Sequence, residues 1–554
     1  MKKILIFCLV CTLMLLTACQ AQSPASSNGE QVPPRDPDPG SDTIRYPSEG
    51  EMMYGPQGEA IPMVSENDQK VFVKAYGAVG DGQTDDAAAL KSAVASLEQG
   101  GFIYIEKGTY RLAENVTVPE NITLVFAGGA MLAPDKKVTL KISGFVDADI
   151  RQIFAGKGKI EGIIRNAGYP QWFGTMDEEN CFAAFQAAFD ALQEVLVPGG
   201  AEYTVSNLRI EHPLRVTGQG QKQVQLNLRS NSMRLFDIRS SDVCIANFKI
   251  EGNKSKDSTI IYFNTNEADM SRITISSIWA KNTGFFLRDG ESGGKHTVND
   301  VNLYELRVDS SRSIGYHLTD FRKGIRLDNV QRQNLGVSFD VDVPGMLFCN
   351  IEDMYAADID VTGGGGQDCK GGAVFFENCK NVTLDRAMTE AVNGNNISLK
   401  GCSGFEVNQW VIGEWNDTSL RMDDCTDIEF NLLLIIGNNY PGTTFPSDTY
   451  SPDAAHLTNC RNITFNGLNI QRFFGNGLVL EDTSGVIVNS LVGWTNCGTT
   501  LEERGSSDNN LVNCMTVGEC EGKSVILKGA SSKIIALTLN NGSFVEELVG
   551  PAEK

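Results

Sequence analysis

The alternation of apolar and polar residues predicts that most of this chain folds as short strands. In segments such as 374–376, 397–399, 420–422 and 478–480, apolar residues recur at every second position or in short runs. A period of two is typical of strands that bury one face. No long helical pattern interrupts this region, so the sequence predicts an all-β fold for residues 191–545.

A repeat centred on Cys organises these strands. Cys379, Cys402 and Cys425 are 23 residues apart, Cys460 follows after 35 residues, and Thr483 continues the series after another 23. A unit of 23 residues with two or three short strands is one coil of a parallel β-helix, whose coils stack about 4.8 Å apart. We therefore expect a single-stranded parallel β-helix with a ladder of Cys side chains at one corner.

Two states of this Cys ladder are compatible with the repeat. Unpaired Cys is among the most buried residue types, so the ladder can consist of packed thiols. Disulfides between adjacent coils also fit the expected spacing. The twelve extra residues of the longest unit fall within 437–455, which predicts a long loop there.

The region before the repeat contains a different pattern. A strand at 71–73 precedes a Gly-rich turn, a helical pattern at 87–97 and a returning strand at 102–105, and a weaker copy follows at 169–203. The Asp and Thr residues before the helix favour its N-terminus. The turn reads Gly77-Ala78-x-Gly80-Asp81-Gly82-x-Thr84-Asp85-Asp86.

This ordered motif resembles the opening of pectate-lyase-like β-helix proteins, versions of which occur in family 55 and family 28 glycoside hydrolases and in phage tailspikes. The resemblance implies a right-handed parallel β-helix with short N-terminal capping helices. It assigns residues 66–190 to an N-terminal capping region, 191–545 to the β-helix and 546–554 to a C-terminal tail. It also implies that Asp85 and Asp86 shape the turn and cap the helix.

The first 65 residues have the composition of a targeting segment and a linker. Lys2 and Lys3 precede an apolar run at 4–16, which is short for a membrane span and typical of a signal peptide. Leu16-Thr17-Ala18-Cys19 resembles the bacterial lipoprotein box, which implies removal of residues 1–18, lipidation of Cys19 and anchoring to the membrane at the bacterial cell surface. Residues 19–65 are rich in Pro, Ser and Gly, so we expect a disordered tether.

The charge of the chain restricts its partners. The formal net charge is −22, which argues against nucleic acid, because phosphate binding requires a basic surface. A neutral polysaccharide remains compatible, and an acidic one would require local Arg or Lys side chains. The chain is expected to be a monomer, although the families that it resembles include trimers.

A filled β-helix has no internal pocket, so chemistry is expected on its outer face or in its loops. The repeat suggests that Glu390 and Glu414 lie in one column on adjacent coils, with Asp417 near them. A pair of carboxyl groups is the usual requirement of glycoside hydrolysis. We therefore take Glu390, Glu414 and Asp417 as candidate catalytic residues, with solvated surface carboxylates as the alternative.

Aromatic and basic side chains near these carboxylates suggest sugar binding. The candidates are Trp410, Trp415, Arg472 and Tyr440. The Trp residues can equally be core packing. A rival set in the longer, earlier coils consists of Asp309, Arg312, Asp358 and Asp360.

No cofactor or metal is expected from the motifs. The four His residues are scattered without metal-ligand spacing. Asp358-x-Asp360 could bind calcium but lacks the rest of a calcium-loop pattern. The ordered catalytic motifs of polygalacturonase-like enzymes and pectate lyases are also missing, so the resemblance carries no catalytic residue.

Three functions therefore remain open. The first is a surface enzyme that degrades a polysaccharide as a glycoside hydrolase or polysaccharide lyase. The second is a non-catalytic glycan-binding or adhesive protein, and the third is a structural spacer. Carboxylates that converge in a groove favour the first, and aromatic residues without paired carboxylates favour the second.

Overall fold

The computed structural model describes residues 53–54, 60–61, 69–177, 181–219, 224–293, 295–333, 343–364, 371–392, 395–415, 417–437, 453–473, 475–496, 498–520, 524–540 and 547–548. The chain divides into two compact units, Met1–Ser65 and Glu66–Lys554. In the first unit, β1 (Met53–Tyr54) pairs antiparallel with β2 (Ala60–Ile61). The predicted signal segment and Cys19 lie outside the described residues. Within these ranges, no helix has the length and apolar character needed to cross a membrane.

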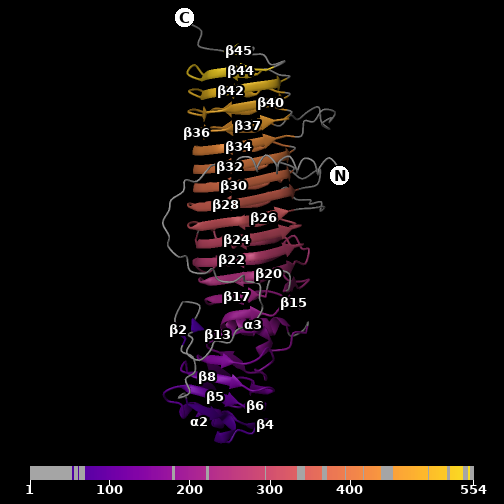
Figure 1. Ribbon diagram of the computed structural model, residues 1–554, viewed down its shortest axis with the longest axis vertical. Helices are drawn as coiled ribbons and strands as arrows, with labels where there is room; N and C mark the ends of the chain where they lie inside the picture. Colours follow the sequence, from indigo (N-terminus) through magenta and orange to yellow (C-terminus); the bar gives the residue numbers. More distant parts are fainter. Residues whose placement is uncertain are drawn as a thin grey trace, which may run out of the picture. The chain divides into compact units, whose positions relative to one another are not determined.

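The second unit is a parallel β-helix, which confirms the predicted fold class (Figure 1). Among the described residues, its major sheet has 19 strands and its minor sheet has 14. The major sheet runs in the order β13 (Ile164–Gly168), β14 (Leu192–Val197), β15 (Glu202–Val205), β17 (Leu214–Gly218), β18 (Gln225–Leu228), β20 (Val243–Glu251), β22 (Met270–Lys281), β24 (Val298–Asp309), β26 (Ile325–Gln333), β28 (Met354–Gly364), β30 (Lys380–Val392), β32 (Ser403–Trp415), β34 (Thr426–Ile436), β36 (Arg461–Phe465), β37 (Leu468–Gln471), β39 (Ile487–Val488), β40 (Leu491–Asn496), β42 (Leu511–Cys520) and β44 (Lys533–Leu539).

The minor sheet closes the other side of each coil. Its strands are β16 (Leu208–Ile210), β19 (Arg234–Ile238), β21 (Thr259–Phe263), β23 (Phe285–Asp289), β25 (Tyr316–Leu318), β27 (Met346–Cys349), β29 (Val374–Glu377), β31 (Ile397–Lys400), β33 (Leu420–Asp423), β35 (Ala455–Thr458), β38 (Leu478–Glu481), β41 (Leu501–Arg504), β43 (Val525–Leu527) and β45 (Glu547–Leu548). Side chains that point inward from both sheets fill the interior, so the solenoid has a packed core.

The N-terminal coils have three separate small sheets. These are β3 (Lys70–Phe72), β5 (Gly101–Ile105), β8 (Ile122–Phe126) and β11 (Phe145–Asp147) in one sheet, β4 (Asp81–Asp85), β6 (Gly108–Leu112) and β9 (Ala130–Pro134) in the second, and β7 (Val116–Val118), β10 (Thr139–Ile142) and β12 (Lys159–Glu161) in the third. The short helical elements are η1 (Val73–Tyr76), α2 (Ala87–Ala95), η2 (Pro170–Trp172) and α3 (Cys181–Ala191).

The Gly-rich motif forms the turn before α2. The Asp86 carboxylate is 1% exposed and accepts hydrogen bonds from the backbone N–H groups of Val79 and Gly80 at 2.7 and 3.1 Å. Asp85 accepts from the N–H groups of Ala113 and Ala87, and these bonds hold the pKa of the Asp85 carboxyl below its usual value. Asp86 therefore shapes the turn but makes no side-chain cap hydrogen bond to α2, whereas Asp85 accepts the N–H of Ala87 at the start of the helix.

The Cys repeat forms the expected ladder, and its members are unpaired thiols. Cys379, Cys402, Cys425 and Cys460 are buried and free. Each donates its S–H to a carbonyl of the preceding coil at 3.4–3.5 Å, as Cys402 does to Phe376. A hydrogen bond to Cys379, together with burial, raises the pKa of the Cys402 thiol to about 12. Disulfides between these coils are absent from the described ladder.

Left-handed backbone positions on both sides of each ladder residue explain the repeated sequence around it. The residue before the ladder position and the residue two after it have positive φ, as Asn378 and Asn381 do at 53° and 52°. Only Gly, Asn and Asp adopt this conformation at low cost. The same pattern recurs at Gly401 and Gly404, Asp424 and Asp427, Asn459 and Asn462, and Asp482 and Gly485.

Candidate functional site

The register of the major sheet corrects the predicted column of site residues. Glu390 in β30 lies opposite Gly413 in β32, not Glu414. From Gly413 the column continues to Ile436, Gln471 and Trp494. Successive residues of a strand point to opposite faces, so a shift of one residue moves a side chain to the other face.

The structure describes some of the sequence-predicted site residues and not others. Trp410 is 0% exposed and packs in the core, so its predicted role in stacking on sugars is wrong. Asp417 accepts a hydrogen bond from the N–H of Thr418, and Arg472 donates its backbone N–H to Trp494. The side chains of Glu414 and Trp415, and all of Tyr440, lie outside what the structure describes.

Two columns of outward-facing side chains in β22, β24, β26, β28 and β30 contain two of the rival candidates, Asp309 and Asp360, whereas Arg312 and Asp358 lie outside them. We call the two columns the charged strip. One column contains Trp279, Arg307, Gln331, Asp360 and Met388, and the other contains Lys281, Asp309, Gln333, Thr362 and Glu390. The strip therefore joins Glu390 to Asp309 and Asp360, which the sequence had placed in a separate candidate set.

The first part of the strip is a compact cluster around Asp309. The Asp309 carboxylate accepts hydrogen bonds from Trp279 Nε1 and Arg307 Nε, both at 2.8 Å. Lys281 Nζ lies 3.9 Å from Asp309 Oδ2 and 4.0 Å from the centroid of the Trp279 ring. These contacts hold one aromatic ring and two cations in fixed positions at the surface.

The second part of the strip contains a carboxyl group with a perturbed pKa. Burial, with a smaller contribution from Asp358, raises the pKa of Asp360, while a hydrogen bond from Thr362 Oγ1 at 2.9 Å opposes this shift. Asp358 itself is held by Arg386, whose Nε and Nη2 donate at 3.1 and 2.5 Å. Asp360 is therefore suited to donate a proton.

Glu390 is the diagonal neighbour of Asp360 on the next coil. Thr362 lies two residues after Asp360 and pairs with Glu390. Diagonal neighbours on one face of a sheet are within reach of each other's long side chains. A pair of carboxyl groups is the usual requirement of glycoside hydrolysis. Gly413, opposite Glu390 on the following coil, has no side chain, and an added Cβ would lie 3.6 Å from Glu390 Cγ.

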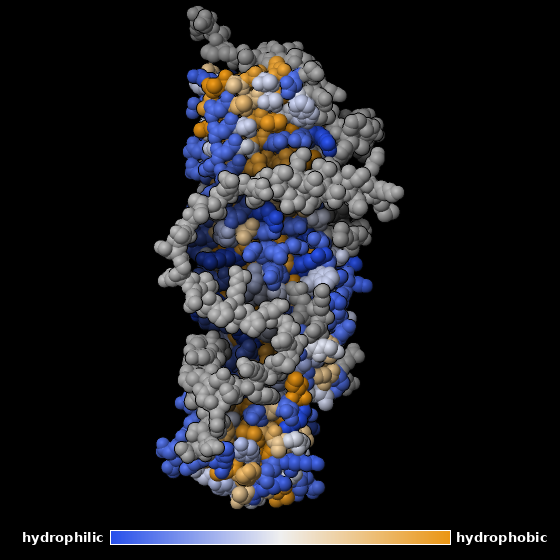
Figure 2. Space-filling model, viewed as in Figure 1, coloured by the Kyte–Doolittle hydropathy of each residue, from blue (hydrophilic) through white to orange (hydrophobic). Residues whose placement is uncertain are grey.

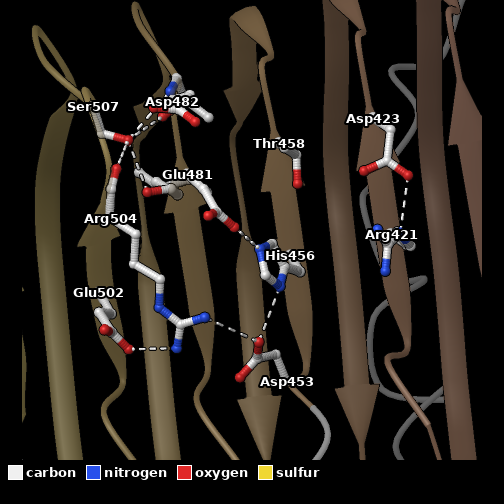
Figure 3. A network of polar contacts seen from close by, with 12 residues as sticks. Arg421, Asp423, Asp453, His456, Thr458, Glu481, Asp482, Glu502, Arg504 and Ser507 are labelled. Carbon is white, nitrogen blue, oxygen red and sulfur yellow. Dashed lines mark hydrogen bonds and ion pairs between the residues drawn. The ribbon is translucent and has the colours of Figure 1, made fainter.

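A second polar constellation lies on the minor sheet (Figure 3). His456 contacts Asp453 through Nδ1 and Glu481 through Nε2, both at 3.0 Å, and Arg504 contacts Glu502 at 2.9 Å. The hydrogen bonds to Asp453 and Glu481 raise the pKa of His456. His456 joins Asp453 of its own coil to Glu481 of the next coil, and Arg504 pairs with Glu502 of its own strand, so the network consists of opposite charges and fits a stabilising role.

Some buried polar groups had no signal in the sequence. Arg332 points into the solenoid, where its Nε donates to Ser311 Oγ at 3.2 Å, and burial lowers the pKa of Arg332 to about 10. Asp289 is fully buried, and burial raises its pKa to about 6. Among the described residues, no group of three or more His, Cys, Asp or Glu is arranged to hold a metal ion.

Comparison with protein families agrees with the β-helix fold. Residues 71–308 match the family described as "Rhamnogalacturonase A/epimerase, pectate lyase-like". Residues 71–308 of the β-helix therefore resemble a pectate-lyase-like domain. The match covers the N-terminal coils and β22 and ends within β24 at residue 308, before Asp309, Asp360 and Glu390.

Curated relatives match shorter stretches of the chain. A probable rhamnogalacturonase C of Aspergillus niger is 26% identical over 121 residues, which are 22% of this chain and 26% of that protein. A pre-neck appendage protein of Bacillus phage B103 is 43% identical over 58 residues, 10% of this chain and 6% of that protein. The chain thus covers about a quarter or less of the length of these relatives.

Solved structures overlap with the chain at low scores. The A-module of the mannuronan C-5 epimerase AlgE4 from Azotobacter vinelandii has 12% identity and a TM-score of 0.24, with 84% of this chain and all of that chain covered. The Streptococcus pneumoniae surface protein and adhesin PfbA has 12% identity and a TM-score of 0.22, with 81% and 100% covered. Overlaps this low carry no functional conclusion.

Proposed function

We propose that this protein is a polysaccharide-degrading enzyme whose active site is the charged strip. The observation that carries the proposal is the diagonal placement of Asp360 and Glu390, one with a raised pKa, beside an ordered cluster of Trp, Lys and Arg. The family description names rhamnogalacturonase and epimerase proteins, and the Aspergillus relative is a probable rhamnogalacturonase, which supports a polysaccharide as the substrate.

In this mechanism the two carboxyl groups have different roles. Burial raises the pKa of Asp360, and Asp360 is the group that protonates the oxygen of the leaving sugar. Glu390 accepts a proton from the attacking water on the opposite side of the sugar ring. Trp279, Lys281 and Arg307 orient the chain through ring stacking and hydrogen bonds to its oxygen atoms.

A polysaccharide panel tests this function directly. Reducing ends report hydrolysis, and absorbance from unsaturated products reports a lyase. With Asp360→Asn or Glu390→Gln, we expect kcat on the substrate to fall by about 10²–10⁴, the usual contribution of general acid–base catalysis. Glu429→Gln is the matched control, because Glu429 is exposed on the same sheet outside the strip.

The outcomes separate enzyme from binding protein. Full activity in both strip variants would contradict the assignment of the active site. Binding of a polysaccharide without turnover, weakened by Trp279→Ala, would support the non-catalytic glycan-binding protein instead. The ordered Trp279–Lys281 contact is the observation that keeps this second function open.

We also propose that the protein is anchored to the bacterial cell surface through lipids on Cys19. The proposal rests on the Leu16-Thr17-Ala18-Cys19 motif and the apolar run before it. Mass spectrometry of the mature N-terminal peptide should find acyl chains on Cys19. A Cys19→Ser variant should lose them and leave the membrane fraction, and an unmodified Cys19 in the wild-type protein would contradict the proposal.

A further inference from the structure

A hollow lies on the outer face of the major sheet, directly before the charged strip. Its volume is about 700 Å³, and the described residues that line it are the loop 199–201, Glu202 of β15, Gln219, Gln225 of β18 and Lys249 of β20. We call it the Lys249 hollow. All four named side chains form hydrogen bonds, so the hollow suits a polar ligand such as a sugar.

The register of the major sheet joins this hollow to the charged strip without an intervening strand. Glu202 pairs with Gln225, which pairs with Lys249. Lys249 in turn pairs with Trp279, where the first column of the strip begins. The residues on either side of Lys249 are 0% exposed, so Lys249 itself points outward. Adjacent strands lie about 4.8 Å apart, so a ligand that covers Trp279 also reaches Lys249.

Lys249 is the cation of the hollow, and the carboxylates around it have other partners. Glu202 in the same column accepts a hydrogen bond from Asn227 Nδ2 at 3.2 Å. Glu251 in the neighbouring column accepts one from Asn282 Nδ2 at 2.6 Å. Within the described part of the chain, neither carboxylate forms an ion pair with Lys249. The ammonium group can therefore pair with an anionic group of a ligand.

The two amide side chains of the hollow are each held at one end. Gln219 Oε1 accepts the N–H of Gly199 at 2.8 Å, and Gln225 Nε2 donates to Asn227 Oδ1 at 2.8 Å. Gln219 therefore offers a donor and Gln225 an acceptor, and sugar hydroxyl groups match both. Figure 2 likewise shows mainly hydrophilic residues where Figure 1 draws β22 to β26, the coils that follow the hollow.

We propose that the Lys249 hollow is a subsite for an anionic sugar residue of the polysaccharide that is cleaved at the charged strip. The anionic group, a carboxylate or a sulfate, pairs with Lys249, and the two Gln side chains bind hydroxyl groups. Four strand steps of about 4.8 Å, or roughly 19 Å, separate Lys249 from Asp360. Only a chain of several sugars can therefore occupy both places. This inference rests on the proposed function and adds the charge of the substrate to it.

Titration calorimetry on the full chain tests the subsite with polygalacturonate, a sulfated galactan and a neutral galactan. Lys249→Gln removes the charge and keeps the length of the side chain, and Lys249→Arg keeps the charge. Lys533→Gln is the matched control, because Lys533 is exposed on the last strand of the same sheet. We expect Lys249→Gln to bind an anionic probe about tenfold more weakly at low salt, and Lys249→Arg to bind like the wild type. The probe that is affected identifies the anionic group as a carboxylate or a sulfate.

Two further readouts separate a lost charge from a damaged fold. The difference in affinity between the wild type and Lys249→Gln should shrink as NaCl is added, because salt screens charge pairs at the surface. Oligosaccharides too short to reach from Asp360 to Lys249 should be cleaved with the same kcat/KM by both proteins. Long anionic chains should be cleaved with a lower kcat/KM by Lys249→Gln.

The possible results distinguish this inference from the proposed function. Weaker binding of an anionic probe by Lys249→Gln, without cleavage of any probe by the wild type, supports the subsite and contradicts the function. Loss of cleavage in Asp360→Asn, with the affinity of Lys249→Gln unchanged, supports the function and overturns the subsite. Binding of the neutral galactan alone, equally by the wild type and Lys249→Gln, would also overturn the subsite.

Discussion

The coils from β21 to β30 differ from the coils from β31 to β38, although both contribute strands to the same two sheets. In the later coils, residues recur every 23 positions apart from one long loop, and Cys, Asn, Asp and Gly occupy fixed corner positions. In the earlier coils, the intervals are longer, and buried or paired carboxyl groups lie at strand ends, as Asp289 does in β23 and Asp309 does in β24.

The outer faces of these two regions differ in the same way. In the regular coils, Asn408, Asn431, Asn466, Asn489 and Asn513 form a ladder of amide hydrogen bonds of 2.6–2.8 Å. Such a ladder repeats one contact and stabilises the stacking of coils. In the earlier coils, each outward residue differs from its neighbours, as in the charged strip. The regular coils thus stabilise the stack through repeated contacts. We expect the functional side chains in the coils that depart from the repeat.

The largest expected effect is the loss of stability caused by a charged side chain in the Cys ladder of the regular coils. Cys425→Asp would place a carboxyl group between Cys402 and Cys460 in the core, where an unpaired charge costs several kcal/mol. We expect loss of folding or a decrease of about 4 kcal/mol or more in the free energy of unfolding, measured by chemical denaturation. Cys425→Thr is the control, because Thr483 continues the same ladder. Equal stability of both variants would contradict the ladder.

A smaller effect is expected at the left-handed corners. Gly404 has φ +66°, and a Cβ there would lie 3.0 Å from Asn381 Oδ1. Gly404→Val should therefore destabilise the protein by about 1–3 kcal/mol, seen as a lower Tm. Gly404→Asn should cost less, because Asn occupies the same conformation at Asn381 and Asn462. If Asn and Val were equally costly, the conformational explanation would be wrong.

The smallest expected effect is a pH dependence of the folding stability that arises from the His456 network. Its partners Asp453 and Glu481 raise the pKa of His456 in the folded state, against the opposing charge of Arg504. The stabilisation is therefore complete below the unfolded pKa of about 6.5 and is lost as pH rises through the folded pKa. Denaturation midpoints should fall over that interval in the wild type and stay flat in His456→Gln. Parallel curves for the two proteins would exclude the effect.

Much of the fold could be predicted because the repeat has a physical cause. A ladder residue recurs every 23 positions since equivalent residues must stack, and this alone predicted the coils and the Cys corner. The same period, applied strictly, places residue 413 opposite 390, which would have avoided the error at Glu414. It also aligns Ala387, Trp410 and Leu433 as one apolar column, which identifies Trp410 as a core residue.

The charged strip could not be assembled from the sequence because its coils vary in length. Asp309, Asp360 and Glu390 are separated by 51 and 30 residues, and no constant interval relates them. The buried position of Arg332 could not be predicted either. Arg332 shares its column with Val308 and Val361, and no local pattern predicts a buried cation. Register in irregular coils depends on loop lengths that only the structure supplies.

Oxidative footprinting with a bound polysaccharide tests most directly whether the irregular coils carry the ligand. Trp279 and Met388 lie at the two ends of one column of the strip, and Met388 is 38% exposed. The account predicts that both lose reactivity to hydroxyl radicals when the polysaccharide binds, while Met233, which is 52% exposed and outside the strip, does not. Protection of side chains on the regular coils, such as Leu432, with Trp279 and Met388 unchanged, would contradict it.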